Sequence, residues 1–217
     1  MFIGHYGVAL AAKRVAPRAS LGVLIMAAQL VDLIWPVLLL TGVEHVSLAT
    51  IDNPFLRLTF DSYPWTHSLL TTVGWGVLAG VIYAALRRDR TSGLIVGALV
   101  VSHWVLDWIT HLADLPLYPG GPRVGLGLWQ SINATMIVEA VLFAVGLIVY
   151  ARVTRPVDRL GRLAFLGLVA LLAVLYLGNA YGPPPTSVDA VAWGALGGWL
   201  VPLFGWWVDR HRATAPA

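Results

Sequence analysis

Cysteine is absent from the 217-residue sequence, and lysine occurs once, as Lys13. Without cysteine, disulfides, thiolate nucleophiles and cysteine-ligated zinc are excluded, and a bound metal must be held by histidine, aspartate or glutamate. The sequence also lacks the H-E-x-x-H pattern of metalloproteases and the G-x-S-x-G turn that presents a catalytic serine. The enzyme classes that depend on these two motifs are therefore disfavoured.

Charged residues are scarce. They make up 12% of the chain, about half the share usual in soluble domains, whereas 58% of residues are hydrophobic and the mean hydropathy is +0.77. The apolar content excludes a disordered chain, and the absence of a repeat excludes collagen. Ten tryptophans and seven tyrosines suit the aromatic belts at membrane interfaces. These features predict a membrane protein.

Six segments are long enough to cross a bilayer, whose hydrocarbon core of ~30 Å requires about 20 apolar residues per helix. They lie at 19–41, 66–86, 92–112, 128–151, 163–181 and 188–208. We therefore predict an all-α fold, a polytopic membrane helical bundle of about six transmembrane helices.

Basic residues are distributed unevenly around these spans. Twelve of the fourteen fall in the terminal segments and in the loops on one side, and the other side has only Arg57 and Arg123. Because cytoplasmic loops of membrane proteins are rich in lysine and arginine, both termini are predicted to be cytoplasmic. The same bias explains the net charge of +3, so nucleic acid is not an expected partner.

Residues 1–12 are apolar but too short to span a bilayer. Lys13 and Arg14 follow this segment instead of preceding it, which is the wrong order for a secretory signal. At ~1.5 Å per residue, a helix here reaches about the middle of the bilayer from Lys13. One interpretation is a short re-entrant helix that carries His5 into the bundle. The other is an interfacial helix that lies on the membrane surface.

Three titratable residues recur every four positions in the third span: His103, Asp107 and His111. On a helix they cover an arc of about 80°, and Asp114 falls inside that arc. Charged groups inside a membrane are costly, which makes each of them a functional candidate. Nitrogen and oxygen donors on one helix face suit zinc or a similar divalent ion. A structural polar network and an ion or proton pathway are the alternatives.

Asp32, His67 and Glu139 lie in other spans at a matching depth. Counting along each span puts all these candidates in the half of the bundle opposite the basic side, where a site opens outward or laterally to the outer leaflet. Arg123 stands beside this site, and its fork of donors suits an anionic group such as phosphate; simple solvation in the loop is the alternative. Asp114 is a second candidate for substrate contact. The outer 42–65 loop holds residues expected to be mostly solvated, namely Glu44, His45, Asp52 and Asp61.

The order of the candidate residues resembles a known family. His5, Asp32, Thr66-His67-Ser68 and His103-xxx-Asp107-xxx-His111 look like the bacterial membrane-bound metal-dependent hydrolases of the LexA-regulated inner-membrane (YdjM-like) type. The resemblance covers roughly 1–145 and implies that this part is a metal-site core in the bacterial cytoplasmic membrane. The two additional transmembrane helices of 163–208 are expected to complete a single integral membrane domain, 1–217.

The ligand order is also similar to that of the zinc-dependent phospholipase C and P1 nuclease superfamily. There an early His, an Asp, a His, an HxxxDxxxH helix and a later HxxxE hold a zinc cluster. The similarity implies metal-ligand roles for the matching residues, His5, Asp32, His67, His103, Asp107 and His111. Glu139 matches the final glutamate, but Thr135 stands where the motif has histidine. We therefore expect a site for one or two ions and not for three. Zinc is favoured, and the same donors tolerate manganese or iron.

Together these features predict a membrane-embedded metal-dependent hydrolase that uses a metal-activated water. Asp107 is expected as a ligand or bridge, Asp32 as the general base or a bridging ligand, and Glu139 as a ligand or base. The outer placement favours membrane lipids as partners and a phosphoester of a lipid or lipid-linked substrate as the target. An ion or proton transporter and a metal-binding membrane protein without catalysis are the alternative functions.

Overall fold

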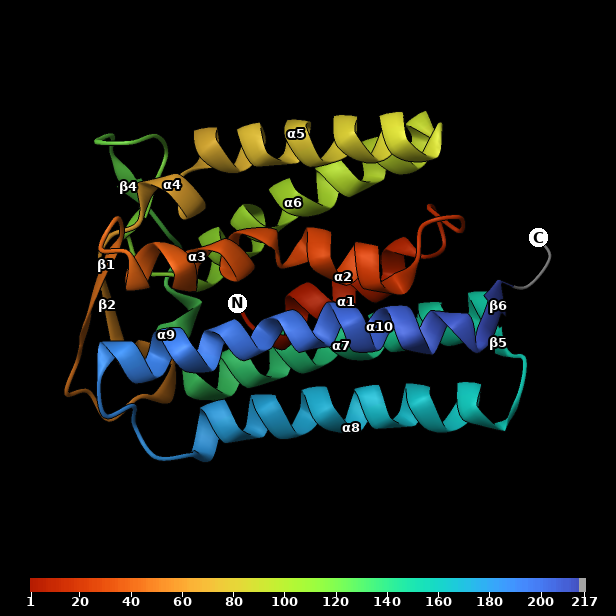
Figure 1. Cartoon of the computed structure of the whole chain (residues 1–217). Coiled ribbons are helices and arrows are strands. Elements are labelled where there is room, and N and C mark those ends of the chain that lie inside the picture. The colour runs from red at the N-terminus through yellow and green to blue at the C-terminus, as the bar shows by residue number, and fades with distance from the viewer. Residues whose placement is uncertain (215–217) are drawn as a thin grey trace.

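The predicted all-α membrane bundle is confirmed by a computed structural model, which describes residues 1–214 (Figure 1). Within that range five helical stretches are long and apolar enough to cross a membrane. They are α5 (Leu69–Arg87), α6 (Arg90–Thr110), α7 (Ile132–Val153), α8 (Arg159–Tyr181), and the run of α9 (Val188–Leu196), η3 (Gly197–Trp199) and α10 (Leu200–Arg210). A sixth is present if the bent pair α2 (Leu21–Ala28) and α3 (Leu30–Leu40) counts as one span.

The first predicted span, 19–41, is not one straight helix. The chain bends by 55° between α2 and α3, at Gln29, whose backbone dihedrals of φ −111° and ψ 7° lie outside the α-helical region. The bend ends α2 early, so the carbonyl of Ala28 lies at a helix terminus, where carbonyls need partners from outside the helix. It also redirects α3, whose first turn carries Asp32.

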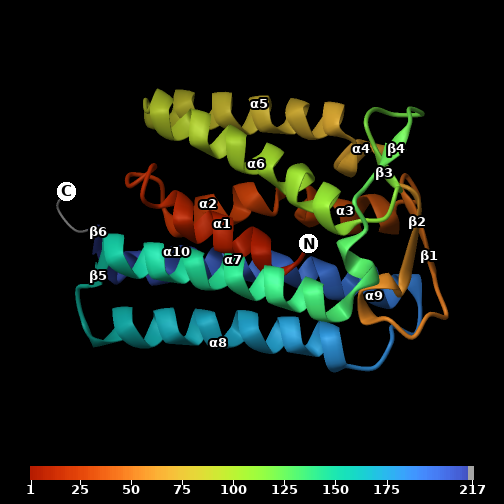
Figure 2. The same cartoon turned by 180° about the vertical axis from the view of Figure 1, so that it is seen from behind.

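The N-terminal segment is a buried helix, α1 (Ile3–Ala12), packed mainly against α7, α2 and α6. Its first residues lie in the middle of the bundle in both views (Figures 1 and 2). Its other end is tied to α10, because Lys13 donates to Asp209 at 2.7 Å. The structure therefore agrees with the re-entrant interpretation, and the alternative of a helix lying on the membrane surface is wrong.

Close approach of α1 to α7 depends on two glycines that face each other. A Cβ atom added to Gly7 would lie 2.5 Å from the Leu142 carbonyl oxygen, and one added to Gly146 would overlap the carbonyl of Gly7. Small residues at such crossings let helix backbones touch, which is the usual way helices associate within a membrane. The contact fixes how deeply α1 reaches into the bundle.

Short strands close both ends of the bundle. At one end β1 (His45–Leu48) pairs antiparallel with β2 (Leu58–Ser62), and β3 (Leu115–Pro116) pairs with β4 (Arg123–Val124). Along the chain, η1 (Pro54–Leu56) lies between β1 and β2, α4 (Pro64–His67) follows β2, and η2 (Leu128–Gln130) follows β4. At the other end β5 (Thr154–Pro156) pairs with β6 (Arg212–Thr214). The hairpins that hold the candidate site are therefore all at one end.

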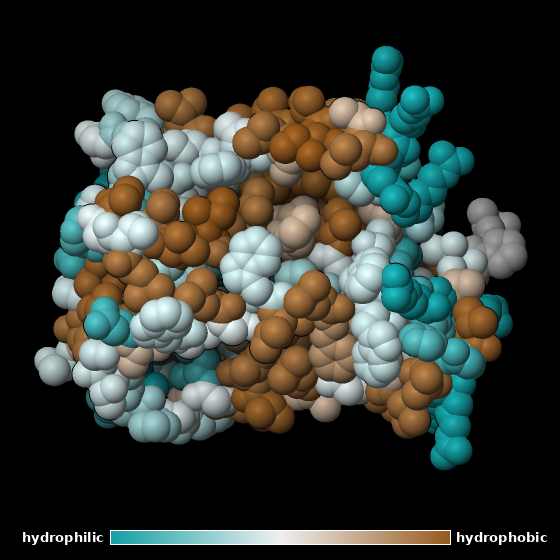
Figure 3. Space-filling view, in the orientation of Figure 1, coloured by the Kyte–Doolittle hydropathy of each residue, from teal (hydrophilic) through white to brown (hydrophobic). Residues whose placement is uncertain are grey.

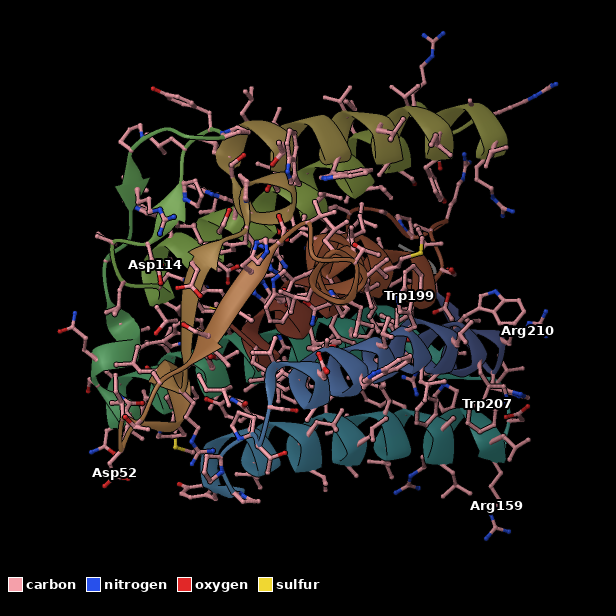
Figure 4. The ribbon with its side chains drawn as sticks, turned by 60° about the vertical axis from the view of Figure 1, so that its left-hand side comes forward. Asp52, Asp114, Arg159, Trp199, Trp207 and Arg210 are labelled. Atoms are coloured by element: carbon pink, nitrogen blue, oxygen red, sulfur yellow. The ribbon has the colours of Figure 1, made fainter. Side chains whose placement is uncertain are left out.

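The two ends also differ in charge. Hydrophobic side chains cover the middle of the molecule, and long hydrophilic side chains project from the end opposite the β1–β2 hairpin (Figure 3). Arg159 and Arg210 lie at this basic end, whereas Asp52 and Asp114 lie at the hairpin end (Figure 4). An apolar band between two polar ends is the surface that a bilayer requires.

Candidate metal centre

Five of the seven predicted metal-ligating residues meet inside the bundle. His5 comes from α1, Asp32 from α3, His67 from α4, and His103 and Asp107 from α6. Their ligand atoms form two overlapping groups, His5–His103–Asp107 and Asp32–His67–His103, within each of which all atoms lie within 4.8 Å of one another. His103 belongs to both groups. Each group can hold a metal ion.

Asp107 is buried between three imidazoles. Its Oδ1 lies 3.1 Å from His5 Nε2, and its Oδ2 lies 3.1 Å from His103 Nε2 and 3.9 Å from His67 Nε2. The amino group of Met1 also donates to Oδ1. One carboxylate therefore joins ligand atoms from three different helices.

Asp32 is the second carboxylate of the cluster. Its Oδ1 lies 3.2 Å from His67 Nε2 and 3.6 Å from His103 Nε2. Its side chain is 39% exposed, whereas the side chains of His67, His103 and Asp107 are at most 5% exposed. Asp32 is thus the more accessible of the two carboxylates.

His103 is oriented by the bend between α2 and α3. Its Nδ1 lies 2.7 Å from the Ala28 carbonyl, which can only accept, so Nδ1 carries the proton. In the neutral ring Nε2 then holds a lone pair, and this atom has no hydrogen-bond partner among the described residues although it faces Asp107 Oδ2. A lone pair facing a carboxylate is repulsive, so either a metal cation lies between them or the ring carries a second proton and donates to Asp107. Metal-ligating histidines commonly donate their other N–H to a backbone carbonyl in this way.

His67 is oriented by a chain of side chains that ends at Glu44. Thr66 Oγ1 donates to Glu44 Oε2 at 2.7 Å and lies 2.7 Å from His67 Nδ1, whose proton it therefore accepts. His67 Nε2 is left as the atom that faces Asp32. The chain of hydrogen bonds orients this ring with Nε2 toward Asp32, the arrangement in which an acidic partner supports a metal-bound histidine in other proteins.

Glu44 corrects an expectation from the sequence, since it is 1% exposed and not solvated. Its Oε1 accepts from the backbone N–H groups of Trp65 and Thr66, at 2.8 and 2.9 Å, so the start of α4 folds around it. Burial of this carboxylate is compensated by three donors. The one sequence signal for a buried acid here was Thr66 beside His67. The Thr66 hydroxyl needs a hydrogen-bond acceptor once it is buried.

The rings of His5 and His103 are stacked, with centroids 3.8 Å apart and planes within 2°. Two imidazolium cations would repel each other in this arrangement, so at least one ring is neutral and can donate a lone pair to a cation. The donor set of the whole cluster is three imidazole nitrogens and two carboxylates. Such a set suits zinc, and manganese or iron can use the same donors.

His111 lies outside both groups, although it is the third residue of the four-residue series. Helix α6 ends at Thr110 and His111 is its C-cap, whose backbone N–H still donates to the Asp107 carbonyl at 2.7 Å. Its side chain therefore stays on the same helix face, but the ring is held one turn beyond Asp107 by residues that follow the helix. Its Nδ1 lies 3.0 Å from Asp114 Oδ1, and its ring packs on Trp129 with centroids 4.1 Å apart. Burial lowers the pKa of His111, and the hydrogen bond with Asp114 opposes that shift.

Asp114 and Glu139 hold parts of the site in place. Asp114 Oδ1 also accepts from Tyr63 at 3.3 Å, and burial raises the pKa of that phenol. Glu139 Oε2 accepts from the backbone N–H groups of Phe2 and Gly4, at 2.8 and 3.2 Å, and so caps the start of α1. Glu139 belongs to neither ligand group, but its Oε1 is buried without a hydrogen-bond partner among the described residues.

A cavity of about 380 Å³ lies over the cluster. Asp32, His67, Asp107, His111 and Glu139 contribute to its wall. The rest is mostly aromatic and apolar, from Phe2, Trp35, Pro54, Phe55, Leu58, Phe60, Trp129, Gly178, Pro183, Pro185 and Val191. In Figure 3 the surface is hollowed between α9 and the end of α8, the elements that supply Val191 and Gly178.

The two basic residues of this end have different surroundings. Arg123, the residue expected to meet an anion, does not line the cavity, and its guanidinium donates to the carbonyls of Phe60 and Asp61, at 3.3 and 2.6 Å. Arg57, to which the sequence analysis assigned no role, lines the cavity. The sequence placed both arginines on the side opposite the basic loops, but it contained no signal for which of them lines the cavity.

Comparisons with protein-family models, curated proteins and solved structures gave no match to this chain.

Proposed function

We propose that this chain is a membrane-embedded metal-dependent hydrolase that acts on a phosphoester of a lipid or lipid-linked substrate. One observation carries the proposal. Buried imidazoles and carboxylates converge under a cavity of about 380 Å³, and two of the histidines have Nδ1 tied to a second partner, which leaves Nε2 as the ligand atom. The structural alternative is an ion-pair network in which His103 carries a proton on both nitrogens and donates to Asp107, and the metal analysis below separates the two.

The residues divide into ligands and positioning groups. His5, His67, His103, Asp32 and Asp107 would hold one or two divalent ions, with zinc favoured. When bound, such an ion lowers the pKa of a coordinated water toward ~7 and polarises a phosphoryl oxygen. Asp32 combines contact with two imidazoles and access to the cavity, so it is the candidate to accept a proton from water or to bridge two ions.

The substrate class follows from where the cavity lies. It is at the end of the bundle opposite the basic end, and its wall is largely apolar. We place the basic end in the cytoplasm of a bacterial cell and the cavity at the outer side of the inner membrane. Membrane lipids reach such a cavity, and the carboxylate-held ion would recognise their phosphate ester.

The test is metal content per chain, measured by elemental mass spectrometry on detergent-purified protein. We expect one or two divalent ions in the wild type, which are lost in His103→Ala and Asp107→Asn. His45→Ala is the matched control, because His45 is an exposed histidine at the same end, and it should keep the metal. Thermal unfolding of each variant shows whether it is folded.

The metal-loaded wild type is then assayed against phosphomonoesters and phosphodiesters of lipids and of water-soluble alcohols. Hydrolysis that is lost in His103→Ala and retained in His45→Ala would support the proposal. Wild-type protein that binds no metal after reloading would overturn it. Metal binding without hydrolysis of any phosphoester would identify a non-catalytic metal protein, and ion flux in sealed vesicles would identify a transporter.

A further inference from the structure

Arg57 is the guanidinium in the wall of the cavity over the metal-ligand cluster. It follows η1 directly, and that turn is anchored on both sides. Asn53 Oδ1 caps η1 by accepting from Phe55 N–H at 3.0 Å, and Asn53 Nδ2 donates to the Trp129 carbonyl at 2.8 Å. Phe55 is itself buried, with 8% of its surface exposed. The position of Arg57 is thus set by the fold and not by a free loop.

Most of the hydrogen-bonding capacity of Arg57 is unused. Its Nη1 donates to the Gly182 carbonyl at 3.0 Å, and this is the one hydrogen bond that the Arg57 side chain makes to the described part of the chain. No aspartate or glutamate there lies within ion-pair distance of it. A guanidinium has five N–H donors in a planar fork, so donors remain for a ligand. The partial burial of Arg57 makes an unbalanced charge costly unless an anion enters the cavity.

The charges around the cavity favour an anionic ligand. Three carboxylates line the cavity, Asp32, Asp107 and Glu139, and bring up to three negative charges. One divalent ion together with Arg57 balances them, and two divalent ions together with Arg57 leave the loaded site with net positive charge. Guanidinium pairs with phosphate through two parallel N–H···O bonds, so it discriminates by geometry as well as by charge.

The cavity wall shows how the remainder of such a ligand is accommodated. Apart from the cluster it is mostly aromatic, proline and aliphatic, and it opens by the end of α8 and by α9 (Figure 3). An apolar substituent on the phosphate would therefore lie against these side chains. A phosphate ester with an apolar group fits both the charged part of the wall, formed by the cluster and Arg57, and its apolar part.

We infer that Arg57 binds the phosphate group of the substrate in this cavity and thereby sets a preference for phosphoesters over uncharged esters. The inference rests on the proposed function, because it assigns the substrate contact of the same site. Arg57 is not a metal ligand, so its contribution is separable from that of the ion.

The experiment uses the metal-loaded full chain in detergent, with inorganic phosphate as the probe and isothermal titration as the measurement. Arg57→Gln is expected to weaken phosphate binding about tenfold to a hundredfold, the range for lost hydrogen bonds to a charged group. Arg57→Lys should recover part of it, since the charge remains without the fork. Arg123→Gln is the matched control and should bind phosphate like the wild type, because Arg123 does not line the cavity and its guanidinium donates to the backbone carbonyls of Phe60 and Asp61.

Two measurements, metal content and phosphate affinity, separate this inference from the proposed function. Metal content must be unchanged in all three variants. Loss of metal in Arg57→Gln would show that Arg57 acts through the ion site and would overturn the assignment. Phosphate binding as tight in metal-loaded Arg57→Gln as in the wild type would also overturn it, while leaving the metal-dependent hydrolase intact.

The source of the phosphate is tested with two substrates, a water-soluble phosphoester and a phospholipid in vesicles. A raised KM for both in Arg57→Gln would show that the residue recognises the phosphate group itself. An effect on the vesicle substrate alone would mean that Arg57 contacts the membrane surface, which contradicts a role inside the cavity.

Discussion

At the scale of single residues, the ring nitrogen that carries the proton decides whether each histidine can bind a metal. His103 is fixed by the carbonyl of Ala28, and His67 by the hydroxyl of Thr66, which is held in turn by Glu44. Neither fixing group is a ligand. Both act by leaving Nε2 unprotonated and aimed at the carboxylates, which is the form in which imidazole coordinates a cation.

We predict that Glu44→Gln weakens metal binding by about tenfold to a hundredfold, the usual effect of removing a partner behind a metal-bound histidine. The amide is a weaker acceptor for Thr66, so the tautomer of His67 is less firmly held. Competition with a chelator of known affinity measures the change. Thr66→Val should have a similar effect, because it removes the same link.

Asp52→Asn is the control for this prediction, since Asp52 is an exposed acid at the tip of the same loop (Figure 4). It should leave metal affinity unchanged. Equal affinity in wild type, Glu44→Gln and Thr66→Val would show that the chain from Glu44 to His67 does not support a metal ligand.

At the scale of secondary-structure elements, the site depends on a helix that enters the bundle from one end without crossing it. α1 brings His5 to Asp107, and the glycine contact between α1 and α7 sets its depth. Glu139 on α7 holds the start of α1 by accepting from two of its backbone N–H groups. A helix terminus buried in apolar surroundings requires such acceptors or donors, so the same residue both stabilises α1 and positions His5.

We predict that Gly146→Ala lowers thermal stability and metal content together. The added methyl group overlaps the Gly7 carbonyl, so α1 must move away from α7 and take His5 with it. Overpacking of this kind costs about 1–3 kcal/mol. Differential scanning calorimetry and metal analysis on the same preparation measure the two effects.

Gly74→Ala is the matched control, because a Cβ at Gly74 in α5 meets nothing within 4 Å. It should be neutral or slightly stabilising, since alanine is the better helix former by about 1 kcal/mol. Normal metal content in a folded Gly146→Ala protein would show that His5 does not depend on this contact.

At the scale of the whole molecule, an apolar band separates a basic end from the end that holds the cavity (Figures 3 and 4). The basic end is formed by residues such as Arg159 and Arg210 and is closed by the β5–β6 pair. The other end is closed by two hairpins. This asymmetry gives the chain one expected orientation in a bilayer.

We predict that single cysteines introduced at the two ends are labelled from opposite sides of the membrane. Asp52→Cys should react with a membrane-impermeant thiol reagent in intact cells, and Arg159→Cys only after permeabilisation. The chain has no native cysteine, so the signal reports the introduced site alone. The reverse pattern would place the cavity on the cytoplasmic side and contradict an outer-leaflet substrate.

The properties that depend on local composition can be predicted from the sequence alone. Apolar length and low charge specify membrane-spanning helices, because a bilayer demands about 20 apolar residues and an internally bonded backbone. The spacing of His103 and Asp107 placed both on one face of α6, because helical geometry is local and regular.

Which of the other polar residues reach the site depends on how the chain packs. His111 pairs with Asp114 and packs on Trp129, Glu44 is buried by donors from α4, and Arg57 lines the cavity while Arg123 does not. Each outcome depends on where a helix ends or on contacts between segments distant in sequence. Such contacts arise from packing and from the need to satisfy buried polar groups, which no pattern of neighbouring residues records.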